Sequence, residues 1–186
     1  HIKRMREFSL CLGKRVMNLY PEYELTPKKL VQIGWASSLH DIGKIAISDS
    51  IILKPGKLTP DEFELIKSHT TKGSEIIQHR IRLNDRAIYE YAYDIARHHH
   101  EKYDGKGYPD GLKGDEISIA AQIVSLVDVY DALTSKRVYK DAYEPDTAFQ
   151  MILNGHSGTF SPKLLKAFAE VRSEIERLLS MYPDEE

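Results

Sequence analysis

A run of three histidines and a glutamate at 98–101 holds the residues of this chain best suited to chemistry. The loop that follows contains Gly105, Gly107, Tyr108 and Pro109. Adjacent histidines are costly to pack in a core and gain little on a surface, whereas imidazole nitrogens are common metal ligands. The run therefore indicates a metal site, and a metal-dependent hydrolase is the first kind of protein to consider.

Further candidate ligands are spread along the chain. His40 and Asp41 are adjacent, and His69 falls on the apolar face of an amphipathic segment. Asp128 and Asp131 interrupt a long apolar stretch. Each has an ordinary alternative, such as a core histidine bonded to a carbonyl or a buried carboxylate paired with a cation. Taken together, imidazoles and carboxylates from separate inward helix faces suit Fe, Mn or Zn better than Ca or Mg.

The pattern also suits a centre of two metals. Two cations about 3.5–4 Å apart can activate a water and bind phosphate oxygens during in-line attack. Asp41 is the natural bridge, because its carboxylate has two oxygens and follows His40 directly. Lys44, Arg137 and Lys140 add positive charge nearby, although such cations also stabilise the C-terminal ends of helices.

Helices are expected to position these residues, since helical periodicity dominates and no alternating strand pattern is found. A capping hydroxyl precedes proline at Thr26, Thr59 and Ser161, which predicts three helix starts. Gly43 is expected to end the second helix, just after His40. The predicted helices lie near residues 1–19, 26–42, 60–79, 85–100, 116–135, 145–155 and 162–180, with the apolar 116–135 helix in the middle of the domain.

Composition bounds the remaining possibilities. With 186 residues the chain suits one domain with a substantial core. A net charge of -2 offers no general surface for polyanions, so nucleic acid is not an expected partner. Cys11 is the only cysteine, which excludes an intrachain disulfide and fits the cytoplasm. Because the chain begins at His1 rather than Met, we expect a piece of a longer protein, which could itself be anchored in a membrane.

Four segments match one known family in order and spacing: HDIGK at 40–44, ILKPGKLTPDEFELIKSH at 52–69, HHEKYDGKGYPDGL at 99–112 and LVDVYDALTSKRVYKDA at 126–142. Through them the chain resembles an HD-GYP domain of the HD phosphohydrolase superfamily over nearly its whole length. The resemblance implies an all-α fold over residues 1–186, a single HD-type bundle of about seven helices with a Gly-Tyr-Pro loop beside a buried metal site. It also implies hydrolysis of cyclic di-GMP to linear pGpG, and further to GMP, by attack of a metal-bridging hydroxide. The domain would then be the C-terminal catalytic part of a protein with an upstream sensory or receiver domain.

The resemblance assigns roles to individual residues, and His98 matches none of the ligand positions. The metal ligands it implies are His1, His40, Asp41, His69, His99, His100 and Asp128. Asp41 and Lys44 are expected to be catalytic, and the expected substrate contacts are Lys44, Tyr108, Asp131, Arg137 and Lys140. Two divalent metals are implied, with Fe or Mn preferred over Zn, Ni or Mg. A third would need a glutamate one helical turn before His1, which only a longer chain could supply.

Two alternatives to this function stay open. A domain of this kind can act through partner proteins, such as those with GGDEF domains, with little or no catalysis. An enzyme of this kind can also prefer a mixed cyclic GMP–AMP over cyclic di-GMP. The filled ligand positions favour an enzyme, and the sequence does not indicate an oligomeric state.

Overall fold

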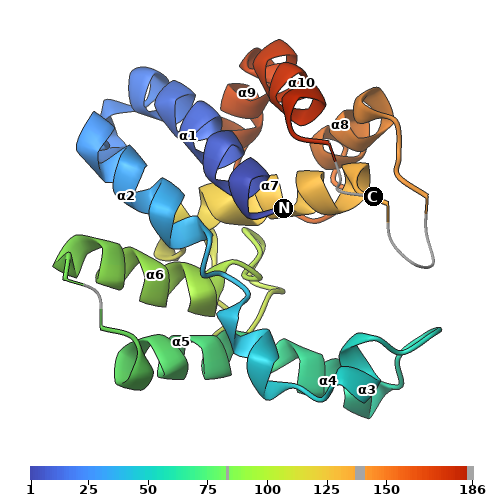
Figure 1. Ribbon diagram of the computed structural model, residues 1–186. Coiled ribbons are helices and arrows are strands. Elements are labelled where there is room, and N and C mark those ends of the chain that lie inside the picture. Colours follow the sequence, from blue (N-terminus) through green and yellow to red (C-terminus); the bar gives the residue numbers. More distant parts are fainter. Residues whose placement is uncertain (83, 137–140, 184–186) are drawn as a thin grey trace.

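The computed structural model describes residues 1–82, 84–136 and 141–183, and this part of the chain is helical and contains no strand (Figure 1). Its α-helices are α1 Ile2–Leu19, α2 Pro27–Ser37, α3 Asp49–Ile52, α4 Pro60–Lys67, α5 His69–Arg80, α6 Arg86–His98, α7 Ile119–Thr134, α8 Pro145–Leu153, α9 Pro162–Glu170 and α10 Arg172–Met181. Short 3-10 segments cover Pro21–Tyr23, Ile42–Ala46 and Gly114–Glu116. The predicted all-α class is confirmed.

Two of the seven predicted helices are each divided in the structure, and the short α3 was not predicted. The helix expected over 60–79 breaks at Ser68, where the hydroxyl donates to the Leu65 carbonyl at 2.5 Å and the His69 ring bonds the Ile66 carbonyl at 2.6 Å. Side chains thus take acceptors that the helix would otherwise use, which ends α4 and begins α5. The helix expected over 162–180 breaks at Val171, where the backbone has φ -104° and ψ 10°.

The second predicted helix ends earlier than expected. We expected 26–42, with Gly43 as its stop, but α2 ends at Ser37 and the chain turns through 38–41 into a 3-10 segment. The Ser37 hydroxyl donates to the Gly34 carbonyl at 2.8 Å, and the His40 ring bonds the Ser37 carbonyl at 2.7 Å. His40 and Asp41 therefore lie in a turn, where their side chains are free of helical spacing.

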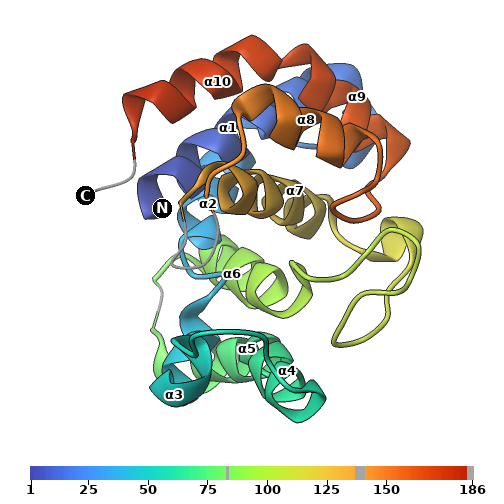
Figure 2. The same ribbon diagram turned by 90° about the vertical axis from the view of Figure 1, so that its right-hand side faces the viewer.

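Helix α7 forms the centre of the fold, as its composition predicts. Figures 1 and 2 both place it between α6 on one side and the group formed by α1, α8, α9 and α10 on the other. Its residues from Ala120 to Val127 are all buried. Tyr130 continues this core, with its ring centroid 5.8 Å from that of Phe8 and 5.7 Å from that of Phe168. The two acids of α7 are thereby fixed at one end of a rigid central helix.

The remaining helices build the second half of the domain. α6 packs against both α2 and α5, and α5 packs against the 3-10 segment Ile42–Ala46 (Figure 1). α3 and α4 contain no buried residue. None of the described helices has the length and apolarity needed to cross a bilayer.

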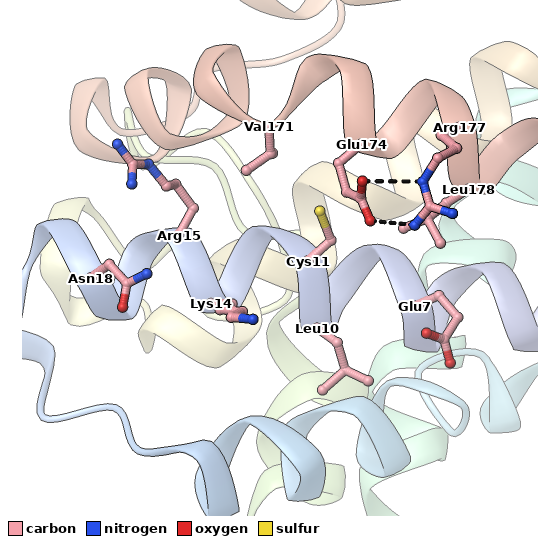
Figure 3. A pocket seen from close by; sticks show the side chains of 10 residues that line it. All are labelled: Glu7, Leu10, Cys11, Lys14, Arg15, Asn18, Val171, Glu174, Arg177 and Leu178. Carbon is pink, nitrogen blue, oxygen red and sulfur yellow. Dashed lines mark hydrogen bonds and ion pairs between the residues drawn. The ribbon is translucent and has the colours of Figure 1, made fainter.

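A groove lies between α1 and α10, away from the predicted ligands (Figure 3). It encloses about 430 Å³, and along its α10 wall Glu174 and Arg177 form an ion pair with each other. Burial and the neighbouring Glu174 raise the pKa of Cys11 in this groove to about 11. The thiol of Cys11 therefore stays protonated at neutral pH, which argues against a nucleophilic cysteine here.

Candidate metal centre

The structure brings most of the predicted metal ligands into two adjacent groups. His69, His99 and His100 form one group, and His1, His40 and Asp41 form the other. Within each group, one ligand atom of every residue lies within 4.8 Å of those of the others. The residues come from four places in the chain, namely the start of α1, the turn after α2, the start of α5 and the end of α6.

Three of the histidines share one arrangement, in which ring Nδ1 bonds a backbone carbonyl of the preceding turn. The pairs are His40 with Ser37 at 2.7 Å, His69 with Ile66 at 2.6 Å and His99 with Ile95 at 2.9 Å. Because a carbonyl oxygen only accepts, each Nδ1 must carry the proton of the hydrogen bond. The neutral ring then presents the lone pair of Nε2, which is the form that binds a metal.

Asp41 lies between these Nε2 atoms. Its Oδ1 is 3.4 Å from His69 Nε2 and 3.8 Å from His99 Nε2, while its Oδ2 is 3.4 Å from His40 Nε2. Each oxygen therefore faces one of the two groups, which is the geometry of a bridging carboxylate. The Lys44 ammonium lies 2.5 Å from Oδ2 and supplies the nearest permanent positive charge.

The residues of the centre fit a pair of divalent cations. His40 Nε2 and Asp41 Oδ1 are buried without a hydrogen-bond partner, at a typical cost of about 1–3 kcal/mol each. His69 Nε2 and His99 Nε2 face each other at 3.3 Å, so two lone pairs meet unless a proton or a cation lies between them. A mixed set of imidazoles and carboxylates is suited to Fe, Mn or Zn.

Burial and charge set opposite protonation states within the centre. Burial opposes a charged His40 ring, but Asp128 and Asp41 outweigh it and raise the pKa of His40 to about 10. Burial, followed by the charge of His69, lowers the pKa of His100 to about 3. Burial also keeps the pKa values of His69 and His99 below their usual range. In protein stripped of metal, the positive charge shared by these four imidazoles is therefore concentrated on His40.

Metal binding is consequently expected to release a proton from His40. A metal at Nε2 must displace that proton, so affinity should rise about tenfold per pH unit between pH 6.5 and about 10. Calorimetric Mn²⁺ titrations at pH 8 in buffers of different ionisation enthalpy should give close to one proton released. The His40→Gln variant should release about one proton fewer than the wild-type protein. Equal heats in all buffers for the wild-type protein would contradict this assignment.

The two acids of α7 have different partners. Asp128 Oδ1 lies 3.5 Å from His40 Nε2, and although burial favours its neutral form, His40 lowers the pKa of Asp128 to about 2. Asp131 is buried, and its Oδ2 lies 2.6 Å from His1 Nδ1. Asp128 thus faces the second group directly, whereas Asp131 contacts the Nδ1 atom of His1, one of the predicted ligands.

A cavity of about 750 Å³ opens beside the two groups. Its lining includes the predicted substrate contacts Lys44, Tyr108 and Asp131. Its volume is typical of small-molecule sites. Arg137 and Lys140, the other predicted contacts, lie outside the described residues, although Lys136 just before them lines the cavity.

The Gly-Tyr-Pro loop is held by Glu101, a role that the sequence analysis did not assign to this residue. Its buried carboxylate accepts from the backbone N–H groups of Asp110 at 2.7 Å, Gly111 at 3.1 Å and Leu112 at 3.1 Å. Tyr108 of the loop stacks on His100, with ring centroids 5.0 Å apart. An acid placed just before a glycine-rich loop, whose N–H groups need acceptors, was the signal available.

His98 ties the same loop to its helix. Its Nδ1 lies 2.7 Å from Asp94, one turn earlier in α6, and its Nε2 lies 2.9 Å from Asp110 in the loop. The Arg97 guanidinium also donates to both oxygens of Asp110, at 2.7 and 2.8 Å. The first histidine of the run therefore contacts carboxylates of α6 and the loop and belongs to neither ligand group.

Glu101→Gln is expected to loosen this loop. The amide nitrogen of Gln would face a backbone N–H in place of an acceptor oxygen, so we expect a loss of about 1–3 kcal/mol in the free energy of unfolding. Hydrogen exchange of the Asp110 to Leu112 amides should accelerate. Glu116→Gln is the matched control, because the exposed Glu116 carboxylate also accepts from a backbone N–H, that of Lys113, at 2.8 Å. Its free energy of unfolding should differ from that of the wild type by less than about 0.5 kcal/mol. Unchanged exchange in Glu101→Gln would refute the role of Glu101.

Comparisons with known proteins identify the family and agree with the fold. The HD domain family matches residues 4–164. A "Probable cyclic di-GMP phosphodiesterase" of Vibrio cholerae serotype O1 is 38% identical over 100% of this chain and 43% of its own length. A "3'3'-cGAMP-specific phosphodiesterase 2" of the same organism is 38% identical over 87% of this chain and 30% of its own length.

Among solved structures, Bd1817, a HDG"Y"P protein from Bdellovibrio bacteriovorus, superposes with a TM-score of 0.68 at 19% identity, covering 93% of this chain and 51% of the other. At that identity the likeness bears on the fold alone. The chain spans less than half the length of the two curated relatives.

Proposed function

Because the chain belongs to the HD domain family, and within it to the HD-GYP group, we propose that it is a metal-dependent phosphodiesterase that hydrolyses cyclic di-GMP. The first product is the linear dinucleotide pGpG, and a second cut gives GMP. The name of the Vibrio cholerae relative that aligns with the whole chain supports this substrate.

One observation carries the proposal. The Nε2 atoms of His69 and His99 face one oxygen of the Asp41 carboxylate, and that of His40 faces the other, beside a cavity of about 750 Å³. We assign this centre two divalent metals, with Fe or Mn favoured by the donor set over Zn, Ni or Mg. Asp41 would hold both ions, and the other ligands would be His1, His40, His69, His99, His100 and Asp128.

The chain's own residues then bind and orient the substrate. When bound, divalent cations of this kind activate water and neutralise charge on phosphate oxygens. Lys44, with its side chain 44% exposed at the cavity, can hold a phosphate oxygen as a point charge. Burial and the charge of Asp41 raise the pKa of Tyr108, so its hydroxyl keeps its proton and can donate to the substrate. Arg137 and Lys140 are proposed as further phosphate contacts.

The direct test is hydrolysis by protein loaded with Mn²⁺ or, without oxygen, Fe²⁺. Cyclic di-GMP should be converted to pGpG, chelation should stop the reaction, and added metal should restore it. Protein that holds stoichiometric metal and leaves cyclic di-GMP intact would instead favour a module that acts through partners such as GGDEF-domain proteins.

A mixed cyclic GMP–AMP is the second candidate substrate, because one relative of similar identity is named for it. Comparing kcat/KM for the two dinucleotides separates the candidates. In both cases we propose that residues 1–186 form one cytoplasmic catalytic domain of a longer protein that also carries a sensory or receiver domain.

A further inference from the structure

Arg4 is a buried cation beside the metal centre with no role so far. It lies on α1, and its side chain is only 4% exposed. Nε lies 2.6 Å from Asp131 Oδ1, Nη2 donates to the Ser135 hydroxyl at 2.7 Å, and Nη1 donates to the Tyr182 carbonyl at 3.1 Å. The guanidinium thus joins α1 to the end of α7 and to the residue that follows α10.

Asp131 stands between this guanidinium and a ligand. Its Oδ1 faces Arg4 and its Oδ2 faces His1 Nδ1, each at 2.6 Å, and its side chain is 3% exposed. A carboxylate is free to rotate unless its second oxygen is held, and here the second oxygen forms an ion pair with a rigid, planar cation. The ion pair with Arg4 therefore restricts the orientation in which Asp131 accepts from His1.

His1 needs this arrangement because it is oriented differently from the other histidines of the centre. His40, His69 and His99 bond carbonyls only three or four residues away along the chain. His1 Nδ1 instead bonds a side chain 130 residues away. Partners of this kind fix the tautomer and the direction of a metal-binding ring, and their loss typically costs about 10–100-fold in metal affinity.

We propose that Arg4 is a positioning residue that, by holding Asp131, directs His1 Nε2 toward the metal shared with His40 and Asp41. The inference rests on the proposed metal centre but does not depend on which substrate is cleaved. It gives Arg4 and Asp131 a function in binding one metal of the pair, and leaves the metal of the His69 group unaffected.

The test is Mn²⁺ binding by calorimetry, together with the spin-coupled EPR signal of two neighbouring Mn²⁺ ions. Arg4→Met should bind the first Mn²⁺ as the wild-type protein does and the second about 10–100-fold more weakly, with loss of the coupled signal. Arg4→Lys keeps a charge near Asp131 and should recover part of this affinity. Arg6→Met is the matched control, because Arg6 lies on the same helix and stacks on the Trp35 ring at 4.2 Å; it should bind both ions normally.

A double-mutant cycle distinguishes positioning from general destabilisation. In a His1→Gln background, Arg4→Met should cause no further loss of second-metal affinity. Additive losses, equal weakening of both sites, or normal binding of both ions by Arg4→Met would each overturn the proposal. Asp131→Asn provides the same comparison if Arg4→Met does not fold.

Measurements of Mn²⁺ binding and hydrolysis on the wild-type protein distinguish a failure of this inference from a failure of the proposed function. Two bound Mn²⁺ ions with the expected Arg4 effects, in a protein that leaves cyclic di-GMP intact, would support the positioning role and refute the substrate. A wild-type protein that binds fewer than two Mn²⁺ ions would overturn the metal centre and the positioning role together.

Discussion

Asp41→Asn is expected to remove hydrolysis and paired-metal binding together. The amide nitrogen of Asn cannot serve as a ligand, so at most one of the two groups keeps its share of the bridge. Asp41 lies within 3.4 Å of both His40 Nε2 and His69 Nε2, and its charge attracts cations to both groups. We expect the loss in metal affinity to exceed the roughly 10–100-fold typical of residues that only orient ligands.

Elemental analysis and hydrolysis assays on the same preparations provide the measurement. Asp49→Asn is the matched control, because Asp49 is an exposed acid on the nearby α3 and should change neither quantity. Near-normal turnover by Asp41→Asn would show that Asp41 does not bridge the metals. A loss of turnover with both metals retained would also contradict a bridging ligand.

Gly43→Ala is expected to separate the two halves of the centre. A Cβ at this position would lie 1.9 Å from the His69 carbonyl oxygen and 2.5 Å from the Gly73 nitrogen, both backbone atoms. The segment Ile42–Ala46 must then move away from α5, which moves Asp41 away from His69. Overpacking of this kind typically costs about 1–3 kcal/mol, and here the affinity for metal should fall as well.

Denaturant unfolding with and without Mn²⁺ measures both effects. In the control Gly34→Ala, the nearest atoms belong to the side chains of Leu10, at 3.2 Å, and Arg6, at 3.4 Å, which can shift. Alanine also favours the interior of α2 by up to about 1 kcal/mol, so this control should be near neutral. A Gly43→Ala protein as stable as the wild type, with unchanged metal affinity, would contradict the close packing of the two segments.

Local signals in the sequence predicted where helices begin. The Thr26, Thr59 and Ser161 side chains all accept from backbone N–H groups at helix starts, and Thr59 forms a capping box with Glu62. The breaks at Ser68 and Val171 were not predicted, because apolar residues continue at helical spacing across them. What ends those helices is a choice among hydrogen-bond acceptors, and spacing does not encode that choice.

Candidate ligands could be proposed from residue type, because histidines and aspartates on apolar faces need partners. Residues that orient ligands could not be proposed from residue type. Arg4 acts through a carboxylate far along the chain, and Glu101 acts through backbone N–H groups that exist as a set only after the loop has folded. Gly43 was interpreted as the residue that ends a helix. In the structure, the absence of a side chain at Gly43 lets its backbone lie close to that of α5.

Anomalous scattering from crystals loaded with Mn²⁺ or Fe²⁺ tests directly whether the predicted ligands converge on two metal ions. We expect two peaks about 3.5–4 Å apart, one among His69, His99 and His100 and the other among His1, His40 and Asp128, with Asp41 between them. Crystals that show no peak among these side chains, at a metal concentration that saturates the protein in solution, would contradict the metal centre.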